Sequence, residues 1–163
     1  MKAVKEARTL TGEGVSPGVG QGCVWRGDTM LAKRADAYVP GTLAQESEKL
    51  STASRAAAAR MNQRAKGLRA KGEMEAADIM EAHALLAEDP VLLAAIEKEL
   101  ARRKNAPEAV RAAAKEQADV LAGLEDTYIR ERAADVRAVG KALARELLGA
   151  EEEIPADGLL VLA

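Results

Sequence analysis

The sequence predicts a mainly α-helical protein: a four-helix bundle with one helix broken near Pro90 and a few short flanking β-strands. Three observations support this prediction. Apolar side chains recur between residues 42 and 149 at the three- and four-residue spacing of a helix face. The connections between these stretches are short, which makes successive helices antiparallel neighbours. The 163 residues include no Phe, one Trp and two Tyr, so alanine and leucine must fill a core between closely packed helices.

The composition also limits the possible functions. A net charge of −2 gives no general attraction to nucleic acid or to an anionic membrane. The chain has neither an apolar run long enough to span a bilayer nor an N-terminal signal peptide. Its single cysteine, Cys23, cannot form an internal disulfide and suits a reducing compartment. We therefore expect a cytoplasmic protein that neither binds nucleic acid nor inserts into a membrane.

The N-terminal part precedes the helices. Residues 1–11 indicate a tail or a linker. In residues 12–27, glycines alternate with apolar residues around a Ser-Pro-Gly turn, which predicts short strands; these glycines do not form a phosphate-binding fingerprint that leads into a helix. Residues 27–41 form a connector.

The first long helix begins after Thr42, which forms a capping box with Gln45. Gly72 ends this helix. Its basic outer end has no aromatic residues on which bases could stack, so a solvated face is the simpler interpretation. The apolar positions of the helix are Leu43, Leu50, Ala53, Ala57, Met61, Ala65 and Leu68.

A break follows at Asp89, which can cap a new helix that has Pro90 at its first position. Asn105 opens the next helix, and Gly149 closes the last one. Predicted core positions are Leu92, Leu93, Ile96 and Leu100 after the break, then Val110, Ala113, Ala114, Val120, Leu121 and Leu124, and finally Ile129, Ala133, Val136, Val139, Gly140, Leu143 and Leu147.

The last residues, 154–163, end in an apolar run from Leu159 to Leu162 that predicts a buried strand. No turn, cap or charged tail follows it. This pattern favours a segment that belongs to a longer protein.

Residues 72–97, which we call the acidic elbow, contain seven Asp or Glu residues and no Lys or Arg. They also carry more apolar side chains than one buried stripe needs. Such a surface is typical of a docking face for a basic partner. A solvated acidic face over an ordinary bundle core explains the same pattern.

The residues do not form a catalytic constellation. One histidine, His83, and one cysteine, Cys23, lie on different predicted elements and give no metal cluster of ordinary spacing. His83 could in principle accept a phosphoryl group, but its apolar neighbours favour a contact role. We therefore assign no catalytic residue and no metal ligand.

Three segments resemble a known family: GVSPGVGQG at 14–22, IMEAHALLAEDPVL at 79–92 and LEDTYIRERAADVRAVGKAL at 124–143. They are similar to the N-terminal domain of enzyme I, the phosphoenolpyruvate–protein phosphotransferase of the bacterial sugar phosphotransferase system. The resemblance runs from about residue 10 to the end of the chain. It implies a partial α/β lobe formed by residues 12–27 and 154–163. It also implies a helical lobe at 40–149, formed by two helical hairpins, that docks the histidine phosphocarrier protein HPr.

The resemblance further implies a docking site. Glu75 and Asp89 would pair with basic residues of the carrier. Three leucines would form the apolar centre, with three other side chains around it; these are Leu86, Leu92 and Leu121, and His83, Tyr128 and Arg132.

The resemblance implies no transfer chemistry for this segment. The family's phosphohistidine lies in a Gly-Gly-x-Thr-Ser-His motif, which does not occur here, and the phosphoenolpyruvate-binding barrel with its magnesium ligands is absent too. We therefore expect the segment to bind the carrier without a cofactor, whereas the full-length parent would use Mg²⁺. The parent would be enzyme I or a fused multiphosphoryl transfer protein. The alternative function is a stand-alone helical scaffold or adaptor for another protein.

Overall fold

The computed structural model describes residues 23–25, 31, 34–103, 105–150 and 159–161, and the chain divides into two units. The smaller unit comprises residues 1–26 and 153–163. Its described residues are the strands β1 (Cys23–Trp25) and β2 (Leu159–Val161), which pair in parallel with Cys23 opposite Leu159. The rest of the predicted strand regions and the predicted tail at 1–11 lie outside the described residues. An α/β lobe at this place in the chain stays a prediction.

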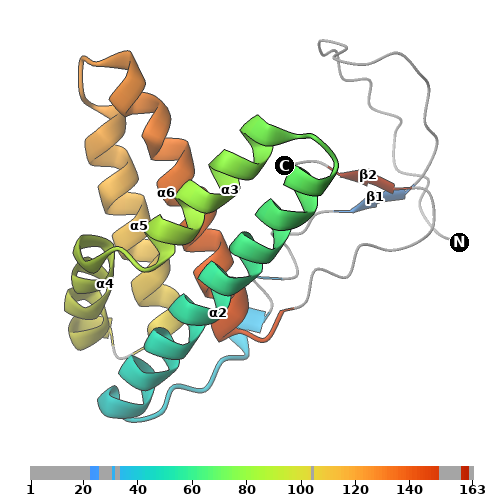
Figure 1. Cartoon of the computed structure of the whole chain (residues 1–163). Helices are drawn as coiled ribbons and strands as arrows, with labels where there is room; N and C mark the ends of the chain where they lie inside the picture. Colours follow the sequence, from blue (N-terminus) through green and yellow to red (C-terminus); the bar gives the residue numbers. More distant parts are fainter. Residues whose placement is uncertain (1–22, 26–30, 32–33, 104, 151–158, 162–163) are drawn as a thin grey trace, which may run out of the picture. The chain divides into compact units, whose positions relative to one another are not determined.

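The larger unit, residues 27–152, is helical and contains α2 (Leu43–Ala70), α3 (Met74–Ala87), α4 (Pro90–Arg103), α5 (Ala106–Ala122) and α6 (Thr127–Leu147). Figure 1 shows α2 and α3 as one hairpin and α5 and α6 as another, with α4 beside α5. The predicted mainly helical fold, with two hairpins and a helix broken near Pro90, is confirmed. None of the described helices is long and apolar enough to cross a membrane.

Local signals set the helix ends where the sequence predicts them. Thr42 and Gln45 form the reciprocal capping box at the start of α2. After α2, Gly72 adopts φ +83°, a left-handed conformation that glycine reaches without strain. Side-chain oxygens also cap α4, α5 and α6; the capping residues are Asp89, Asn105 and Asp126.

The cap at Asp89 gives a test of the helix break. Its Oδ1 accepts hydrogen bonds from the backbone N–H groups of Val91 and Leu92, at 2.8 and 3.0 Å. Asp89→Ala leaves both donors without this acceptor, so we expect the free energy of unfolding in a urea titration to fall by about 1 kcal/mol. Glu88→Ala, at the neighbouring exposed position, should change it by less than about 0.5 kcal/mol. Equal effects of the two variants would contradict a capping role.

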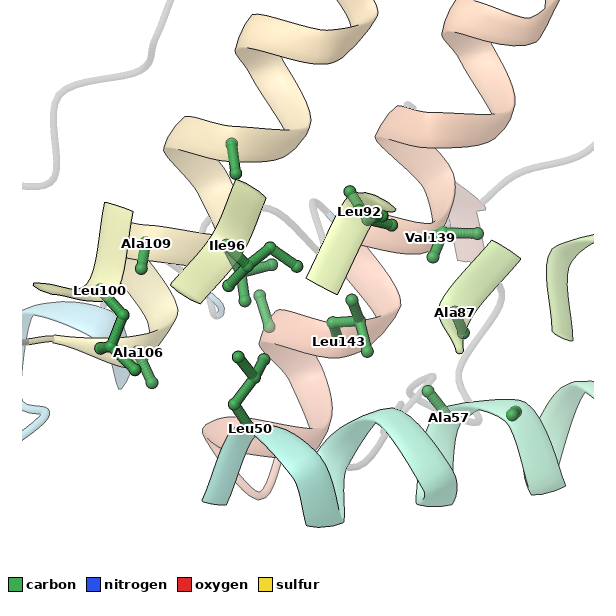
Figure 2. Close-up of a cluster of buried hydrophobic side chains, with 14 of the residues drawn as sticks. Leu50, Ala57, Ala87, Leu92, Ile96, Leu100, Ala106, Ala109, Val139 and Leu143 are labelled. Atoms are coloured by element: carbon green, nitrogen blue, oxygen red, sulfur yellow. The ribbon is translucent and has the colours of Figure 1, made fainter. Parts of the chain in front are cut away.

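The core of the helical unit consists mainly of alanine. Of the 22 buried apolar residues in the described part of the chain, 14 are alanine, so the helices approach closely over small side chains. Figure 2 shows larger side chains, such as Leu50, Ile96 and Leu143, meeting between the helices. A second, smaller cluster lies between α5 and α6 and consists of Ala114, Ala118, Ala133 and Val136.

Three residues predicted in the core are exposed instead. Leu43 is the first residue of α2, Val120 lies in the last turn of α5, and Leu124 lies in the loop that follows. Each satisfies the helical spacing, but all three lie at or just beyond the end of a helix. Periodicity therefore identifies the buried face and does not show where along a helix burial stops.

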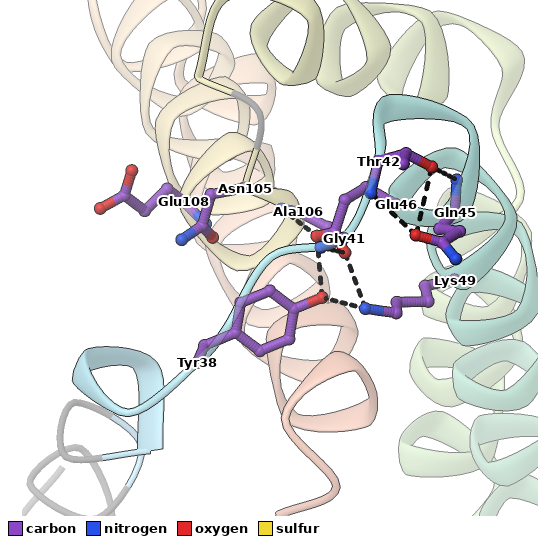
Figure 3. A network of polar contacts seen from close by, with 9 residues as sticks. All are labelled: Tyr38, Gly41, Thr42, Gln45, Glu46, Lys49, Asn105, Ala106 and Glu108. Atoms are coloured by element: carbon purple, nitrogen blue, oxygen red, sulfur yellow. Dashed lines mark hydrogen bonds and ion pairs between the residues drawn. The ribbon is translucent and has the colours of Figure 1, made fainter.

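A buried carboxylate joins the connector to two helices (Figure 3). Glu46, in the first turn of α2, is fully buried. Its Oε1 accepts from the backbone N–H of Gly41 at 3.0 Å and from Lys49 at 2.7 Å, whereas its Oε2 accepts from the hydroxyl of Tyr38 at 2.8 Å and the backbone N–H of Ala106 at 3.0 Å. This contact fixes the start of α5 to the start of α2.

Candidate functional site

The acidic elbow forms α3 and the first part of α4, and its charges are not equally available. Asp78 and Glu81 both accept hydrogen bonds from Arg69 of α2. The hydrogen bond that Glu81 accepts from Arg69 lowers the pKa of Glu81. The side chain of Glu75 is exposed and makes no hydrogen bond or ion pair with any described residue. Glu75 is therefore a carboxylate that a basic partner could use without breaking an existing contact.

Apolar side chains accompany this free carboxylate. Ile79 lies one helical turn beyond Glu75 on the same face of α3 and is 51% exposed. Leu86, two turns further on, is half-buried. Leu85 is 76% exposed on an adjacent face. Neither Ile79 nor Leu85 is among the site residues predicted from the sequence, although the surplus of apolar residues in the elbow is a signal for both.

The three leucines expected at the apolar centre separate in the structure. Leu86 and Leu121 are both half-buried and pack against the small cluster between α5 and α6. Leu92 is only 1% exposed, and Figure 2 shows it within the main core. The expectation for Leu92 is wrong, because α4 packs against the other helices through this residue and Leu92 offers no surface to a partner.

A polar network joins α3 to α6 beside these leucines. Nε2 of His83 lies 3.0 Å from Oδ1 of Asp135, and Oδ2 of Asp135 accepts from Arg132 at 3.0 Å. Arg132 also donates to the hydroxyl of Tyr128 and lies over its ring, with 4.7 Å between Cζ and the ring centroid. Asp135 is not among the site residues predicted from the sequence, although residues 128, 132 and 135 have the spacing of one helix face.

Asp89 caps a helix, a structural role in addition to the contact with a partner that is predicted for it. It is half-buried, and one carboxylate oxygen caps α4. Its pairing with a basic partner stays a prediction. Glu75, His83, Leu86, Leu121, Tyr128 and Arg132 lie on α3, α5 and α6, which are joined by the small apolar cluster and by the contact between His83 and Asp135. We call these six residues, with Ile79 and Asp135, the docking face.

Among the described residues, no three His, Cys, Asp or Glu side chains are placed to hold a metal ion. The Nε2 atom of His83 is paired with the carboxylate of Asp135. A separate groove of about 330 Å³ lies between α5 and α6, with Ala114, Gly140 and Ala144 in its wall, and the described residues that line it include neither His nor Cys. The geometry of the docking face is suited to binding.

Comparisons with known proteins agree with this architecture. The family described as "PEP-utilising enzyme, N-terminal" matches residues 11–132. A phosphoenolpyruvate-protein phosphotransferase of Streptococcus equinus is 35% identical over 95 residues, which are 57% of this chain and 16% of that protein. The chain thus covers less than a fifth of the length of this curated relative.

Two solved structures share the fold. An NMR solution structure of enzyme I matches with a TM-score of 0.63 at 28% identity. The matched region covers 73% of this chain and 50% of the enzyme I chain. The N-terminal domain of "Enzyme 1 - Nitrogen" matches with a TM-score of 0.67 at 25% identity. The matched region covers 85% of this chain and 67% of that domain's chain. Because the family match covers well over half of the chain, this protein belongs to the family of N-terminal domains of phosphoenolpyruvate-utilising enzymes, and its relatives place it with enzyme I.

Proposed function

We propose that the helical unit docks the histidine phosphocarrier protein HPr in the cytoplasm, as part of a phosphoenolpyruvate–protein phosphotransferase of the sugar phosphotransferase system. In this proposal the segment contributes recognition, and the phosphoryl transfer belongs to the parent enzyme. The observation that carries the proposal is the docking face itself: a free carboxylate at Glu75 beside exposed apolar surface at Ile79. The relationship to enzyme I supplies the class of partner.

The physical contributions have different roles. Unpaired carboxylates raise the rate of encounter with a basic carrier, and salt screens this effect. The apolar residues contribute affinity once water is displaced, and burying one side chain the size of Ile79 is worth about 1.5–3 kcal/mol. A relay protein must release its partner rapidly, so we expect a dissociation constant on the order of 1 μM.

The test is an NMR titration of the ¹⁵N-labelled 163-residue chain with unphosphorylated HPr. Shifts should be confined to residues of α3, the end of α5 and the first half of α6. Added EDTA should change nothing, because docking uses side chains alone. Absence of shifts at millimolar HPr would contradict the proposed function and would favour an adaptor for another protein.

Charge reversal identifies the face. Glu75→Lys should weaken HPr binding about tenfold at low salt, and by less as the ionic strength rises, because it replaces an attractive charge with a repulsive one. The matched control is Glu116→Lys, an exposed residue of α5 that lines a different surface groove with Glu99 and Arg102. Equal weakening by both variants would show that net charge, and not this face, determines binding.

Ile79→Asp tests the apolar part. Ile79 suits this purpose better than Leu86, because Leu86 also packs against both buried clusters and its replacement would disturb the fold. The variant should keep its helical circular dichroism and bind HPr at least about tenfold more weakly, since an aspartate there removes most of the apolar contact. Unchanged affinity would exclude Ile79 from the interface.

A further inference from the structure

The contact between His83 and Asp135 joins residues 52 positions apart in the sequence. A carboxylate oxygen can only accept, so the Nε2–H of His83 donates to Oδ1 of Asp135. The side chain of His83 is 11% exposed, and α3 and α6 pack around it. This bond therefore fixes the carboxylate of Asp135 from the buried side.

The other oxygen of Asp135 faces Arg132. Oδ2 accepts from Nη1 of Arg132, while Nη2 of the same guanidinium donates to the hydroxyl of Tyr128 and the group lies over the Tyr128 ring. Burial alone would raise the pKa of Asp135, but the hydrogen bonds from His83 and Arg132 prevail and lower it. Asp135 is consequently a carboxylate at neutral pH and keeps the guanidinium attached.

The network runs from the interior to the surface. Exposure increases from His83 through Asp135 to Arg132, whose side chain is 48% exposed. A guanidinium has five N–H donors, and the two bonds within the network leave donors for an external acceptor. An unrestrained arginine loses rotamer freedom when it is immobilised, a cost that is reduced for a side chain already held in place.

We propose that Asp135 is a positioning residue, which together with His83 orients Arg132 on the Tyr128 ring for contact with an acceptor oxygen of the carrier protein. The proposal rests on the proposed docking function. Arg132 is a cation on an otherwise acidic face, and its charge is compensated by Asp135, so it contributes little to long-range steering. Its role is to set the orientation of the bound carrier, because only an acceptor at the correct place can use its remaining donors.

The test is a double-mutant cycle on HPr binding. Arg132→Ala should weaken binding about tenfold. Asp135→Asn should weaken it about fivefold, because the neutral amide no longer holds the guanidinium, and it should have no further effect in the Arg132→Ala background. A purely structural role for Asp135 would give additive losses in the double variant, and that result would overturn the proposal.

Three further variants serve as comparisons. Asp119→Asn removes a carboxylate that also pairs with two cations, Lys115 and Arg137, but lies on α5 outside the docking face, and it should leave HPr affinity unchanged. His83→Gln keeps a side-chain N–H donor for Asp135 and should retain most of the affinity. His83→Ala should lose as much affinity as Asp135→Asn. Equal affinity of the two His83 variants would contradict the role of His83.

A second measurement uses the free chain in the absence of HPr. In the free chain, the Nη–Hη NMR signals of Arg132, whose Nη1 and Nη2 make the two hydrogen bonds, should be protected from solvent exchange, and Asp135→Asn should abolish the protection at Nη1. If the chain does not bind HPr but this protection is present, the docking proposal fails while the positioning of Arg132 stands. If HPr binds but the signals of Arg132 exchange freely in the unmodified chain, the positioning proposal fails alone.

Discussion

Replacement of Glu46 by glutamine is expected to lower the free energy of unfolding by about 3 kcal/mol at pH 7. The carboxylate of Glu46 accepts from four donors: the N–H groups of Gly41 and Ala106, the ammonium of Lys49 and the hydroxyl of Tyr38. A glutamine amide would place its own N–H₂ against two of these donors. The Glu46 side chain and the residue Ala106 are both buried, so water cannot restore the lost hydrogen bond there, and the loss exceeds that of a surface ion pair.

The same residue should make stability depend on pH. Burial alone would raise the pKa of Glu46, but the hydrogen bonds from Lys49, from the Gly41 and Ala106 amides and from Tyr38 outweigh it and lower the pKa from 4.5 to about 2. A group whose pKa is lower in the folded state stabilises above its unfolded value, and that stability disappears as the pH falls through the folded value. The contribution of Glu46, about 3 kcal/mol, should therefore be present at pH 5 and above and decrease between about pH 4.5 and 2.

Urea unfolding of the unmodified chain and of Glu46→Gln at pH 7, 4 and 3 measures this contribution. The difference between the two proteins should shrink as the pH falls, which separates Glu46 from other carboxylates that titrate in the same range. Glu48→Gln, an exposed residue on the same helix, is the matched control and should change stability by less than about 0.5 kcal/mol at each pH. A difference that does not vary with pH would contradict the assignment of this pKa.

Two glycines in helix interiors should respond in opposite directions to replacement by alanine. Gly140 of α6 is buried, and a Cβ added there would lie 2.5 Å from the Cβ of Ala114 in α5. Both atoms are attached directly to helix backbones, so no rotamer change can relieve the contact and the helices must separate. We expect Gly140→Ala to lower the free energy of unfolding by about 2 kcal/mol, because the overlap exceeds the gain in helix propensity.

Gly67 of α2 provides the control. An added Cβ there meets nothing within 4 Å. Gly67→Ala should therefore stabilise the protein by about 0.5–1 kcal/mol through helix propensity alone. Thermal unfolding monitored by circular dichroism compares both variants with the unmodified chain. Stabilisation by Gly140→Ala would show that α5 and α6 are not in close contact at this point.

Sequence reasoning succeeded where the cause of a structure is local. The capping box at Thr42, the cap at Asp89 and the break at Pro90 depend on residues a few positions apart, and the structure contains all three. The helical spacing also identified the buried faces. It failed at the helix ends, such as Val120, because the extent of burial depends on the neighbouring helices and not on the pattern itself.

The remaining features depend on contacts between residues that lie far apart in the sequence, and no local pattern predicts such contacts. Glu46 has the pattern of a surface residue in a first helical turn, yet a residue 60 positions away buries and binds it. His83 meets Asp135 only because two hairpins pack together. Leu92 satisfies both a core pattern and a family docking pattern, and only the packing of α4 shows that it belongs to the core. For the other site residues, the resemblance supplied the assignment and titration with HPr will test it.

The alanine-rich core has a consequence for the docking face. An alanine side chain has no rotamers, so burying it costs no side-chain entropy and leaves no alternative arrangement of that side chain. A core of this kind has few ways to repack when a partner binds at the surface above it. The spacing between α3, α5 and α6 is thus determined before any contact, and a partner would meet a surface whose shape is already fixed.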